Sequence, residues 1–185
     1  MNAFINILSL YIRYLRQPDC QNTDLFSGFT KFQVITVALV IAFVLNFGFT
    51  IVFTILDILQ IINFEDHAST ILFEEFPPYA IVLLGVIVAP VLEELIFRAP
   101  IPLFCKFKNW FRFIFYGFAI LFGVIHITNF EITKNVLLLA PVLVAPQILI
   151  GFFLGVIRMQ YGLIHSILFH ALYNGVLIIP AVLLM

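Results

Sequence analysis

The chain has 185 residues, of which 63% are hydrophobic and only 10% are charged, and its formal net charge is −1. Soluble globular proteins carry about 25% charged residues, so the composition excludes an ordinary soluble domain and predicts an integral membrane protein. The nearly neutral charge also excludes an overall electrostatic attraction to nucleic acid. Membrane lipid is therefore the first expected partner.

Residues 2–17 predict an amphipathic helix that lies along the membrane interface and ends at Pro18, because their few polar residues recur at helical spacing. A polar connector follows up to residue 30. The start of the chain has no basic region and no small-residue cleavage site, so we expect no removable signal peptide. The polar stripe of the helix consists of Asn2, Asn6, Ser9, Arg13 and Arg16.

Five later segments are apolar and long enough to cross a bilayer, which takes about 20 helical residues. The acidic stretch 63–78 is expected to be a solvated loop, and it divides the chain into an N-terminal part, 1–78, and a helical core, 79–185. The predicted fold is an all-α integral membrane protein, a bundle of about five transmembrane helices preceded by an N-terminal amphipathic interfacial helix. The five predicted spans are residues 33–62, 79–97, 111–128, 136–157 and 162–184.

Basic and acidic connections alternate along these spans, and the positive-inside rule then places the N-terminus in the cytoplasm. Cys20 and Cys105 fall on the basic side and are too few and too far apart to indicate a disulfide framework, so both are expected to be reduced thiols. The basic residues of this side are Arg13, Arg16, Lys31, Lys106, Lys108, Arg112 and Arg158.

The second predicted span contains two adjacent carboxylates, Glu93 and Glu94. A charged side chain at the bilayer centre costs at least about 2.5–3.5 kcal/mol on insertion scales, so this pair needs a compensating role. Glu94 and Arg98 are four residues apart on one helical face and can neutralise each other. Glu93 is rotated by about 100° and has no such local partner. One interpretation is a structural ion pair between Glu94 and Arg98, with Glu93 as a carboxylate that reaches water. Pro90 lies in the same span and is expected to free a backbone carbonyl and bend the helix.

Polar side chains also occur inside two further spans. His170 and Asn174 are four residues apart and therefore share one face of the fifth span, and Phe122 and His126 are related in the same way at the end of the third. With the glutamates they would form a polar centre on three spans, which in a membrane indicates function. A carboxylate can act as a general base on water, a histidine can pass a proton, and an amide can donate to an oxyanion.

Other chemistries have weaker support in the sequence. His165 is rotated by about 140° from His170 and is expected to reach the interface. Ser166 shows no activated geometry as a nucleophile. A metal such as zinc held by Glu93, His126 and His170 is chemically possible, although the chain lacks a His-Glu-x-x-His pattern.

Three motifs on separate spans resemble, in the same order, those of the CPBP intramembrane proteases. That family groups the type II CAAX prenyl endopeptidases with the bacteriocin-processing and self-immunity proteins of the Abi group. The resemblance covers about residues 80–174, and it is specific because all three motifs occur within hydrophobic spans. The motifs are Glu93-Glu94-x-x-x-Arg98, Phe122-x-x-x-His126 and His170-x-x-x-Asn174.

The resemblance implies an intramembrane endopeptidase that hydrolyses a membrane-associated or prenylated-type peptide with glutamate-activated water. In that scheme Glu93 would activate the water with assistance from His126, and no metal cofactor would be needed. The oxyanion would be stabilised by His170 and Asn174, and the site would be held together by Glu94 and Arg98, with Phe122 in a supporting place.

Two other kinds of function stay open at this point. A non-catalytic immunity or binding protein for bacteriocin-like peptides would use the polar centre without hydrolysis and would tolerate a conservative replacement of Glu93. A transporter or haem protein would use the histidines as a proton path or as ligands, and a haem protein would be coloured. The chain is shorter than CAAX-processing members of the family, which favours a small bacterial member acting on a peptide or membrane-protein substrate.

Overall fold

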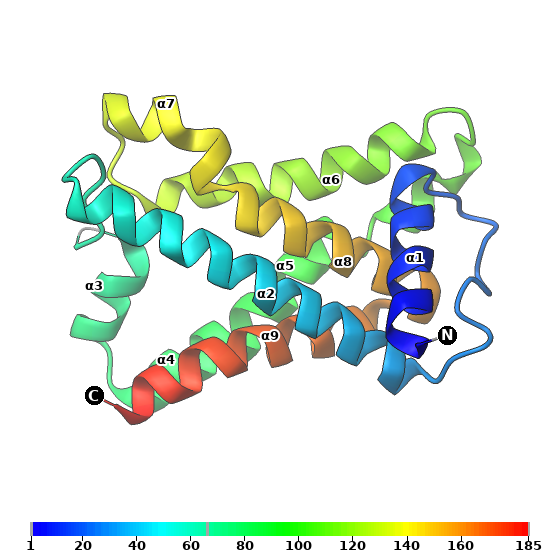
Figure 1. Ribbon diagram of the computed structural model, residues 1–185, viewed down its shortest axis with the longest axis horizontal. Helices are drawn as coiled ribbons and strands as arrows, with labels where there is room; N and C mark the ends of the chain where they lie inside the picture. Colours follow the sequence, from blue (N-terminus) through cyan, green and yellow to red (C-terminus); the bar gives the residue numbers. More distant parts are fainter. Residues whose placement is uncertain (1, 66, 185) are drawn as a thin grey trace.

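The computed structural model describes residues 2–65 and 67–184, and in those ranges every element of regular structure is a helix. Five helical segments are long and apolar enough to cross a membrane, which confirms the predicted all-helical membrane bundle. The two ends of the chain lie at opposite ends of the bundle, as an odd number of spans requires (Figure 1). The spans are Lys31–Ile58, Pro78–Lys106, Phe111–Asn129, Lys134–Tyr161 and Leu163–Leu183.

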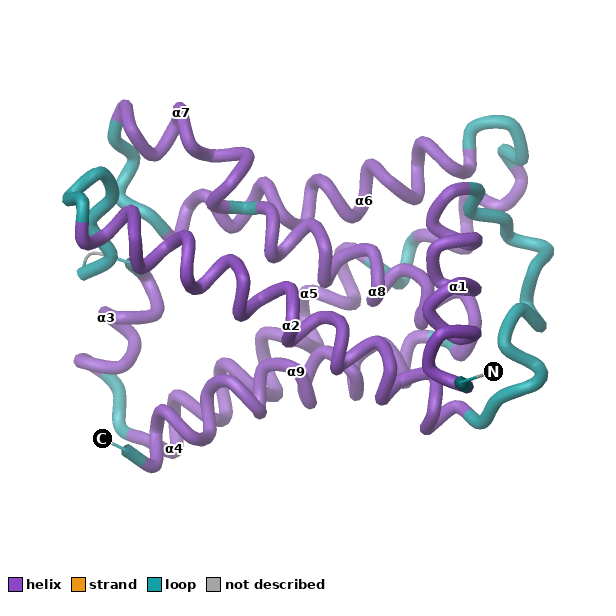
Figure 2. Tube along the Cα trace, in the orientation of Figure 1, coloured by secondary structure: helices purple, strands orange, loops and turns teal. Residues whose placement is uncertain are grey.

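Helix α1 (Ala3–Arg16) crosses one end of the bundle, as Figure 2 also shows. Its apolar face is buried through Ile7, Tyr11 and Tyr14, which pack in the same hydrophobic core as residues of α2 and α8. The Tyr11 hydroxyl donates to the backbone carbonyl of Val34 at 3.4 Å. The predicted amphipathic helix is therefore confirmed, and it also packs against the bundle and is hydrogen-bonded to it.

Helix α2 (Lys31–Ile58) is the first span, and a capping box on Thr30 closes its N-terminus. The helix ends four residues earlier than predicted. The acidic segment that follows was expected to be a loop, and this was wrong for α3 (Ala68–Glu75). The His67 ring caps α3 by accepting from the backbone N–H of Ser69 at 3.2 Å. A helix of eight residues held by a histidine cap leaves no clear hydrophobic period in the sequence.

The second span changes its winding part-way along. Helix α4 (Pro78–Val82) continues into the π-helical η1 (Leu83–Val88) and then into α5 (Ala89–Phe97). In η1 the N–H of Ala89 donates to the carbonyl of Leu84, five residues back. The same register would pair the Gly85 carbonyl with Pro90, which has no N–H to give. The carbonyl that the proline was predicted to free is thus that of Gly85.

The second span continues past Arg98 as a 3₁₀-helix. Arg98 closes α5, and the 3₁₀-helix η2 (Ile101–Lys106) follows with Pro100 as its N-cap and Pro102 in its first turn. The third span consists of α6 (Phe111–Ile125) and the short 3₁₀-helix η3 (His126–Asn129).

The fourth span was predicted as one segment, but it is divided at Val144 into α7 (Lys134–Leu143) and α8 (Ala145–Tyr161). Pro146 removes a backbone donor at the start of α8, and Figure 1 shows α7 turned away from the axis of α8. Helix α9 (Leu163–Leu183) begins directly after Gly162, whose φ of 90° lies in the region that favours glycine.

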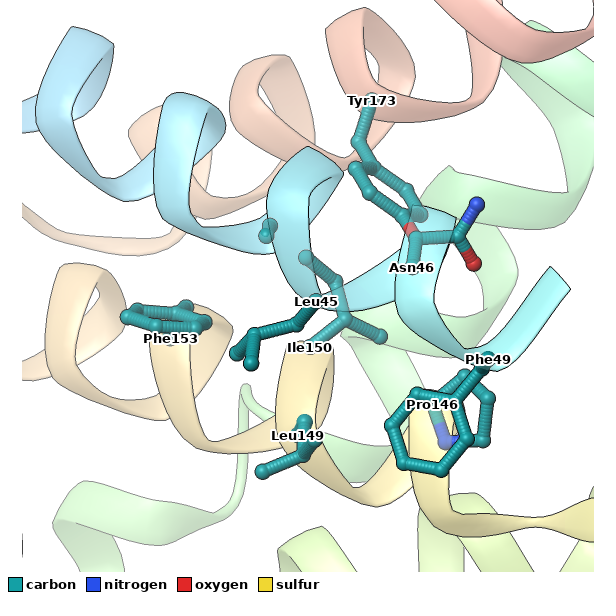
Figure 3. A pocket seen from close by; sticks show the side chains of 9 residues that line it. Leu45, Asn46, Phe49, Pro146, Leu149, Ile150, Phe153 and Tyr173 are labelled. Atoms are coloured by element: carbon teal, nitrogen blue, oxygen red, sulfur yellow. The ribbon is translucent and has the colours of Figure 1, made fainter. Parts of the chain in front are cut away.

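Small residues bring the helices close together at the centre of the bundle. A Cβ on Gly123 of α6 would lie 2.9 Å from the backbone nitrogen of Ile148 in α8, so only glycine permits this approach. Between α2, α8 and α9 a small pocket of about 10 Å³ remains, with Asn46, Pro146 and Tyr173 among its lining residues (Figure 3).

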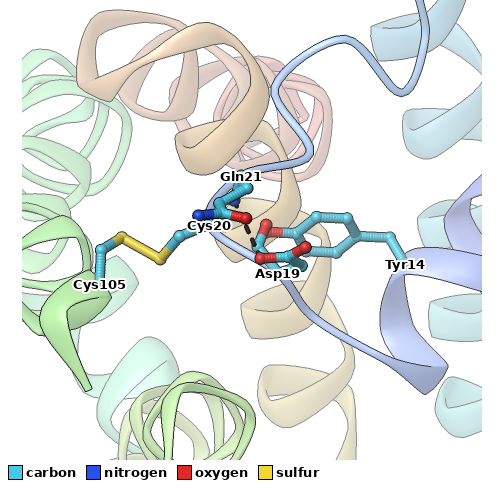
Figure 4. The surroundings of a disulfide bond; sticks show 5 residues. All are labelled: Tyr14, Asp19, Cys20, Gln21 and Cys105. Carbon is cyan, nitrogen blue, oxygen red and sulfur yellow. Dashed lines mark hydrogen bonds between the residues drawn. A yellow bond between two sulfur atoms is a disulfide. The ribbon is translucent and has the colours of Figure 1, made fainter. Parts of the chain in front are cut away.

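Cys20 and Cys105 form a disulfide, which corrects the prediction of two reduced thiols. They are 85 residues apart in the sequence, but their Cα atoms are 5.7 Å apart because the connector after α1 returns across the end of the bundle to η2 (Figure 4). The adjoining turn is held by Asp19, whose carbonyl accepts from the Tyr14 hydroxyl and whose carboxylate accepts from the Gln21 N–H. Sequence spacing does not reveal this bond, because it depends on proximity in the folded chain.

Candidate active site

Glu94 is the centre of a buried polar cluster between α5 and α9. Its side chain is fully buried. One carboxylate oxygen, Oε2, accepts from the Ser166 hydroxyl, and the other, Oε1, lies 3.1 Å from Nδ1 of His170. The Arg98 Nε is 3.6 Å from the same Oε1, so the predicted pair four residues apart is present. Glu94 therefore has an opposite charge and two hydrogen-bonding neighbours, which a buried carboxylate requires.

The Arg98 guanidinium is held mainly by its charge and its packing. Its Cζ lies 4.0 Å from the centre of the Phe122 ring, a cation–π contact that also explains the place of Phe122 in the site. Its Nη1 and Nη2 are buried and have no hydrogen-bond partner within residues 2–65 and 67–184. Gly151 of α8 leaves room for them, since a Cβ there would lie 3.2 Å from Nη2.

Glu93 has a very different environment from its neighbour. Its side chain is 28% exposed, and its ion-pair partner in the described structure is His170, whose Nε2 lies 3.6 Å from the Glu93 carboxylate. The 100° rotation between successive helical residues produces this division. One carboxylate faces the interior of the bundle, and the other lies at the boundary of the buried cluster.

His126 joins this cluster through Phe122. Its Nδ1 donates to the backbone carbonyl of Phe122 at 2.6 Å, because a carbonyl oxygen can only accept. The Phe122 ring lies 4.8 Å from the ring of His126 and 5.8 Å from that of His170. The short 3₁₀ turn after α6 thus brings the end of the third span to the Phe122 ring, which also contacts His170.

Asn174 lies one turn beyond His170 on α9, as predicted, but it does not contact the Glu94 carboxylate as His170 does. Its Nδ2 donates to the Gly85 carbonyl at 2.9 Å. This is the carbonyl that Pro90 leaves without a backbone donor in η1. One N–H of the amide is therefore committed to the second span, and the other has no described hydrogen bond.

Comparison with known protein families places the chain in one family. A family model described as type II CAAX prenyl endopeptidase Rce1-like matches residues 75–176, slightly more than half of the chain. The chain belongs to the Rce1-like family. No curated protein and no solved structure matches it. Membership supports a CAAX-type intramembrane endopeptidase in general terms, and every side chain of the cluster above lies inside the matched range.

Two residues of this Rce1-like site were not recognised from the sequence. Ser166 had been considered as a nucleophile and set aside, whereas its hydroxyl is a donor to Glu94 and to the Leu154 carbonyl at 3.2 Å. Arg158 donates from Nε to the backbone carbonyl of Arg98 at 3.0 Å and so fixes the end of α5. The spacing of Ser166 four residues before His170 was the available signal for the first. His165, expected outside the site, packs against the Tyr161 ring instead.

The residues proposed as an alternative metal site in this Rce1-like protein are not arranged as ligands. In the described part of the chain no group of three His, Cys, Asp or Glu side chains is placed to hold a metal ion. His170 is oriented by Glu94 through Nδ1 and faces Glu93 through Nε2.

Proposed function

We propose that this chain hydrolyses a peptide bond in a membrane-associated peptide, unmodified or prenylated, with Glu93 as the base that activates water. The observation that carries the proposal is the contrast between the two glutamates. Glu94 is fully buried and engaged by Arg98, Ser166 and His170, whereas the Glu93 side chain is 28% exposed and has only a 3.6 Å approach to His170. A base must have room for water, and Glu93 has it.

The proposed reaction begins when the Glu93 carboxylate takes a proton from a water molecule. The water oxygen forms a bond to the scissile carbonyl carbon, and the carbonyl oxygen becomes an oxyanion. The proton then passes to the amide nitrogen, the C–N bond breaks, and the products are a carboxylate and an amine. Nδ1 of His126 is committed to a carbonyl, so its Nε2 is the acceptor that orients the water.

The oxyanion needs donors that are already in place before the reaction. Asn174 has one N–H on the Gly85 carbonyl, which fixes the orientation of the amide, and its second N–H is available for the oxyanion. His170, when protonated, would donate from Nε2, because its Nδ1 is occupied by Glu94. No step of this proposal passes through a metal or another cofactor, and the expected partners are lipid and a peptide or membrane-protein substrate.

The test is cleavage of a peptide panel by the purified protein and its Glu93→Gln variant. The panel contains peptides that end in a farnesylated cysteine followed by three residues, together with their unprenylated forms. General-base removal should lower the rate by about 10²–10⁴-fold, whereas Glu75→Gln on the exposed surface of α3 should leave it unchanged. Equal rates for Glu93→Gln and the unaltered protein would refute the assignment, and loss of activity with a chelator would refute the metal-free route.

We further propose that the end of the bundle carrying α1 faces the cytoplasm of a bacterial inner membrane. The separation of basic residues to this end supports the orientation. The disulfide lies at the same end, although disulfides are rare in the cytoplasm. Fusions to the C-terminus decide between the two orientations: alkaline phosphatase should be active there and green fluorescent protein dark, and the reverse result would invert the topology.

A further inference from the structure

A second, larger cavity lies beside His126, at the end of the bundle that carries α3 and α7. Its volume is about 270 Å³, far above the roughly 10–15 Å³ that a single water needs. Asn46 of α2 and His67 before α3 form part of its wall, and both lie outside the family match of 75–176. Asn129 and Gln147 complete the polar side of the wall.

The three side-chain amides of the cavity wall have no hydrogen-bond partner among the described residues. The side-chain amides of Asn46, Asn129 and Gln147 are each half-buried, and none has a hydrogen bond in the described ranges. An amide that is taken out of water without a partner costs about 1–3 kcal/mol. Three such groups on three different elements around one cavity are therefore suited to a polar ligand.

The two histidines of the wall have opposite hydrogen-bonding roles. Nδ1 of His67 accepts from the Ser69 N–H at 3.2 Å, so the neutral ring carries its proton on Nε2 and can donate. His126 donates from Nδ1 to Phe122, so its Nε2 can accept. Burial, and to a smaller extent His126, lower the pKa of His67, which keeps that ring neutral. No lysine, arginine, aspartate or glutamate is among the described lining residues.

Part of the cavity wall is aromatic. The ring centres of Phe53 and Phe64 are 5.7 Å apart, as are those of Phe64 and Phe130, and the His67 ring meets Phe130 edge-on at 4.6 Å. A fitting ligand is uncharged, carries both donors and acceptors, and presents an apolar group on one side. An extended polypeptide backbone with a large apolar side chain has these properties.

We propose that this cavity binds an extended stretch of the peptide substrate next to the scissile bond. The backbone amides of the peptide would meet Asn46, Gln147 and the histidines, and one large apolar side chain would lie against the phenylalanines. This inference rests on the proposed function, since His126 is the residue common to the cavity and the carboxylate cluster. On its inner side the cavity adjoins the pocket of about 10 Å³, which Asn46 and Pro146 also line (Figure 3).

Cysteine protection tests the site directly, because both native cysteines are already bonded to each other. In the Glu93→Gln background, the Gln147→Cys variant is labelled with a water-soluble maleimide, with and without the farnesylated peptide or its unprenylated form. At ten times the dissociation constant the peptide should slow labelling by about tenfold. The matched control is Thr128→Cys, an exposed position beside Asn129 that does not line the cavity, and its labelling should not change. Equal labelling of the Gln147→Cys variant with and without both peptides would overturn the proposal.

A kinetic comparison with a second variant keeps the proposal testable if the Gln147→Cys variant does not fold. Asn46→Leu should raise KM by about fivefold to tenfold through the loss of one hydrogen bond and leave kcat unchanged. Thr50→Val, at an exposed position one turn further along α2 that does not line the cavity, should change neither. If the Asn46→Leu variant cleaved the peptide with an unchanged KM, the cavity would not bind the substrate, although the proposed function would stand. Protection without any cleavage would support the cavity as a peptide site while the proposed function falls.

Discussion

The hydrogen bond from Asn174 to the Gly85 carbonyl should be the partner that compensates for Pro90. Replacing Asn174 with Leu leaves that carbonyl half-buried without a donor, because its position in η1 points to a proline nitrogen. An unsatisfied buried carbonyl costs about 1–3 kcal/mol, and interhelical hydrogen bonds in membranes have measured values of about 0.6–1.7 kcal/mol. We expect Asn174→Leu to destabilise the fold by about 1–2 kcal/mol.

The same reasoning makes this cost depend on Pro90. In a Pro90→Ala background the new backbone N–H can take the Gly85 carbonyl, so Asn174→Leu should then cost less than about 0.5 kcal/mol. The free energy of unfolding of the four proteins, measured by denaturant titration in mixed micelles, gives the coupling energy. Asn129→Leu is the matched control, since that amide has no described partner to lose. If Asn174→Leu had the same cost with and without the proline, the carbonyl would not be the one that Pro90 frees.

Further consequences concern the ion pair, the disulfide and His67. Arg98→Met should destabilise the protein by about 3–5 kcal/mol because it leaves Glu94 buried and uncompensated, and adding Glu94→Gln should restore part of the loss in the same titration. Reducing the disulfide should lower the free energy of unfolding by at most about 4 kcal/mol. This is less than its 85-residue loop would imply for a soluble chain, because the spans stay inserted in the membrane. An unchanged melting temperature would show that the disulfide does not stabilise the fold. Burial lowers the pKa of His67, so folding disfavours the protonation of its ring. The free energy of unfolding should therefore fall as the pH drops below 6.5, the ordinary pKa of histidine, and His67→Gln should remove this dependence. An NMR titration midpoint of His67 above 6.5 would contradict this prediction.

Hydropathy was sufficient to predict the five spans of the bundle. A run of about 20 apolar residues has few alternatives to a membrane helix, and polar residues within such a run are conspicuous. The spacing of four residues between Glu94 and Arg98 also predicted a contact that the structure contains. These inferences share one property: each depends on residues of the same helix.

Contacts between distant parts of the chain were not predictable in the same way. Ser166 and His170 both reach Glu94 only because α5 and α9 lie side by side with a particular rotation. The disulfide likewise depends on how the connector after α1 returns to η2. Helix α3 was missed for another reason: a helix of only eight residues with one side-chain cap and no buried residue leaves a weak signal in the sequence.

Two adjacent glutamates need partners that compensate for their mutual repulsion, which a single glutamate would not need. Two neighbouring carboxylates repel each other, and the interior of a bundle screens that repulsion poorly. Arg98 is paired with Glu94, and its two terminal nitrogens have no hydrogen-bond acceptor in the described structure. Its guanidinium also lies over the face of Phe122. Glu93 has His170 as its ion-pair partner in the described structure, so the two neighbouring carboxylates are compensated by different side chains.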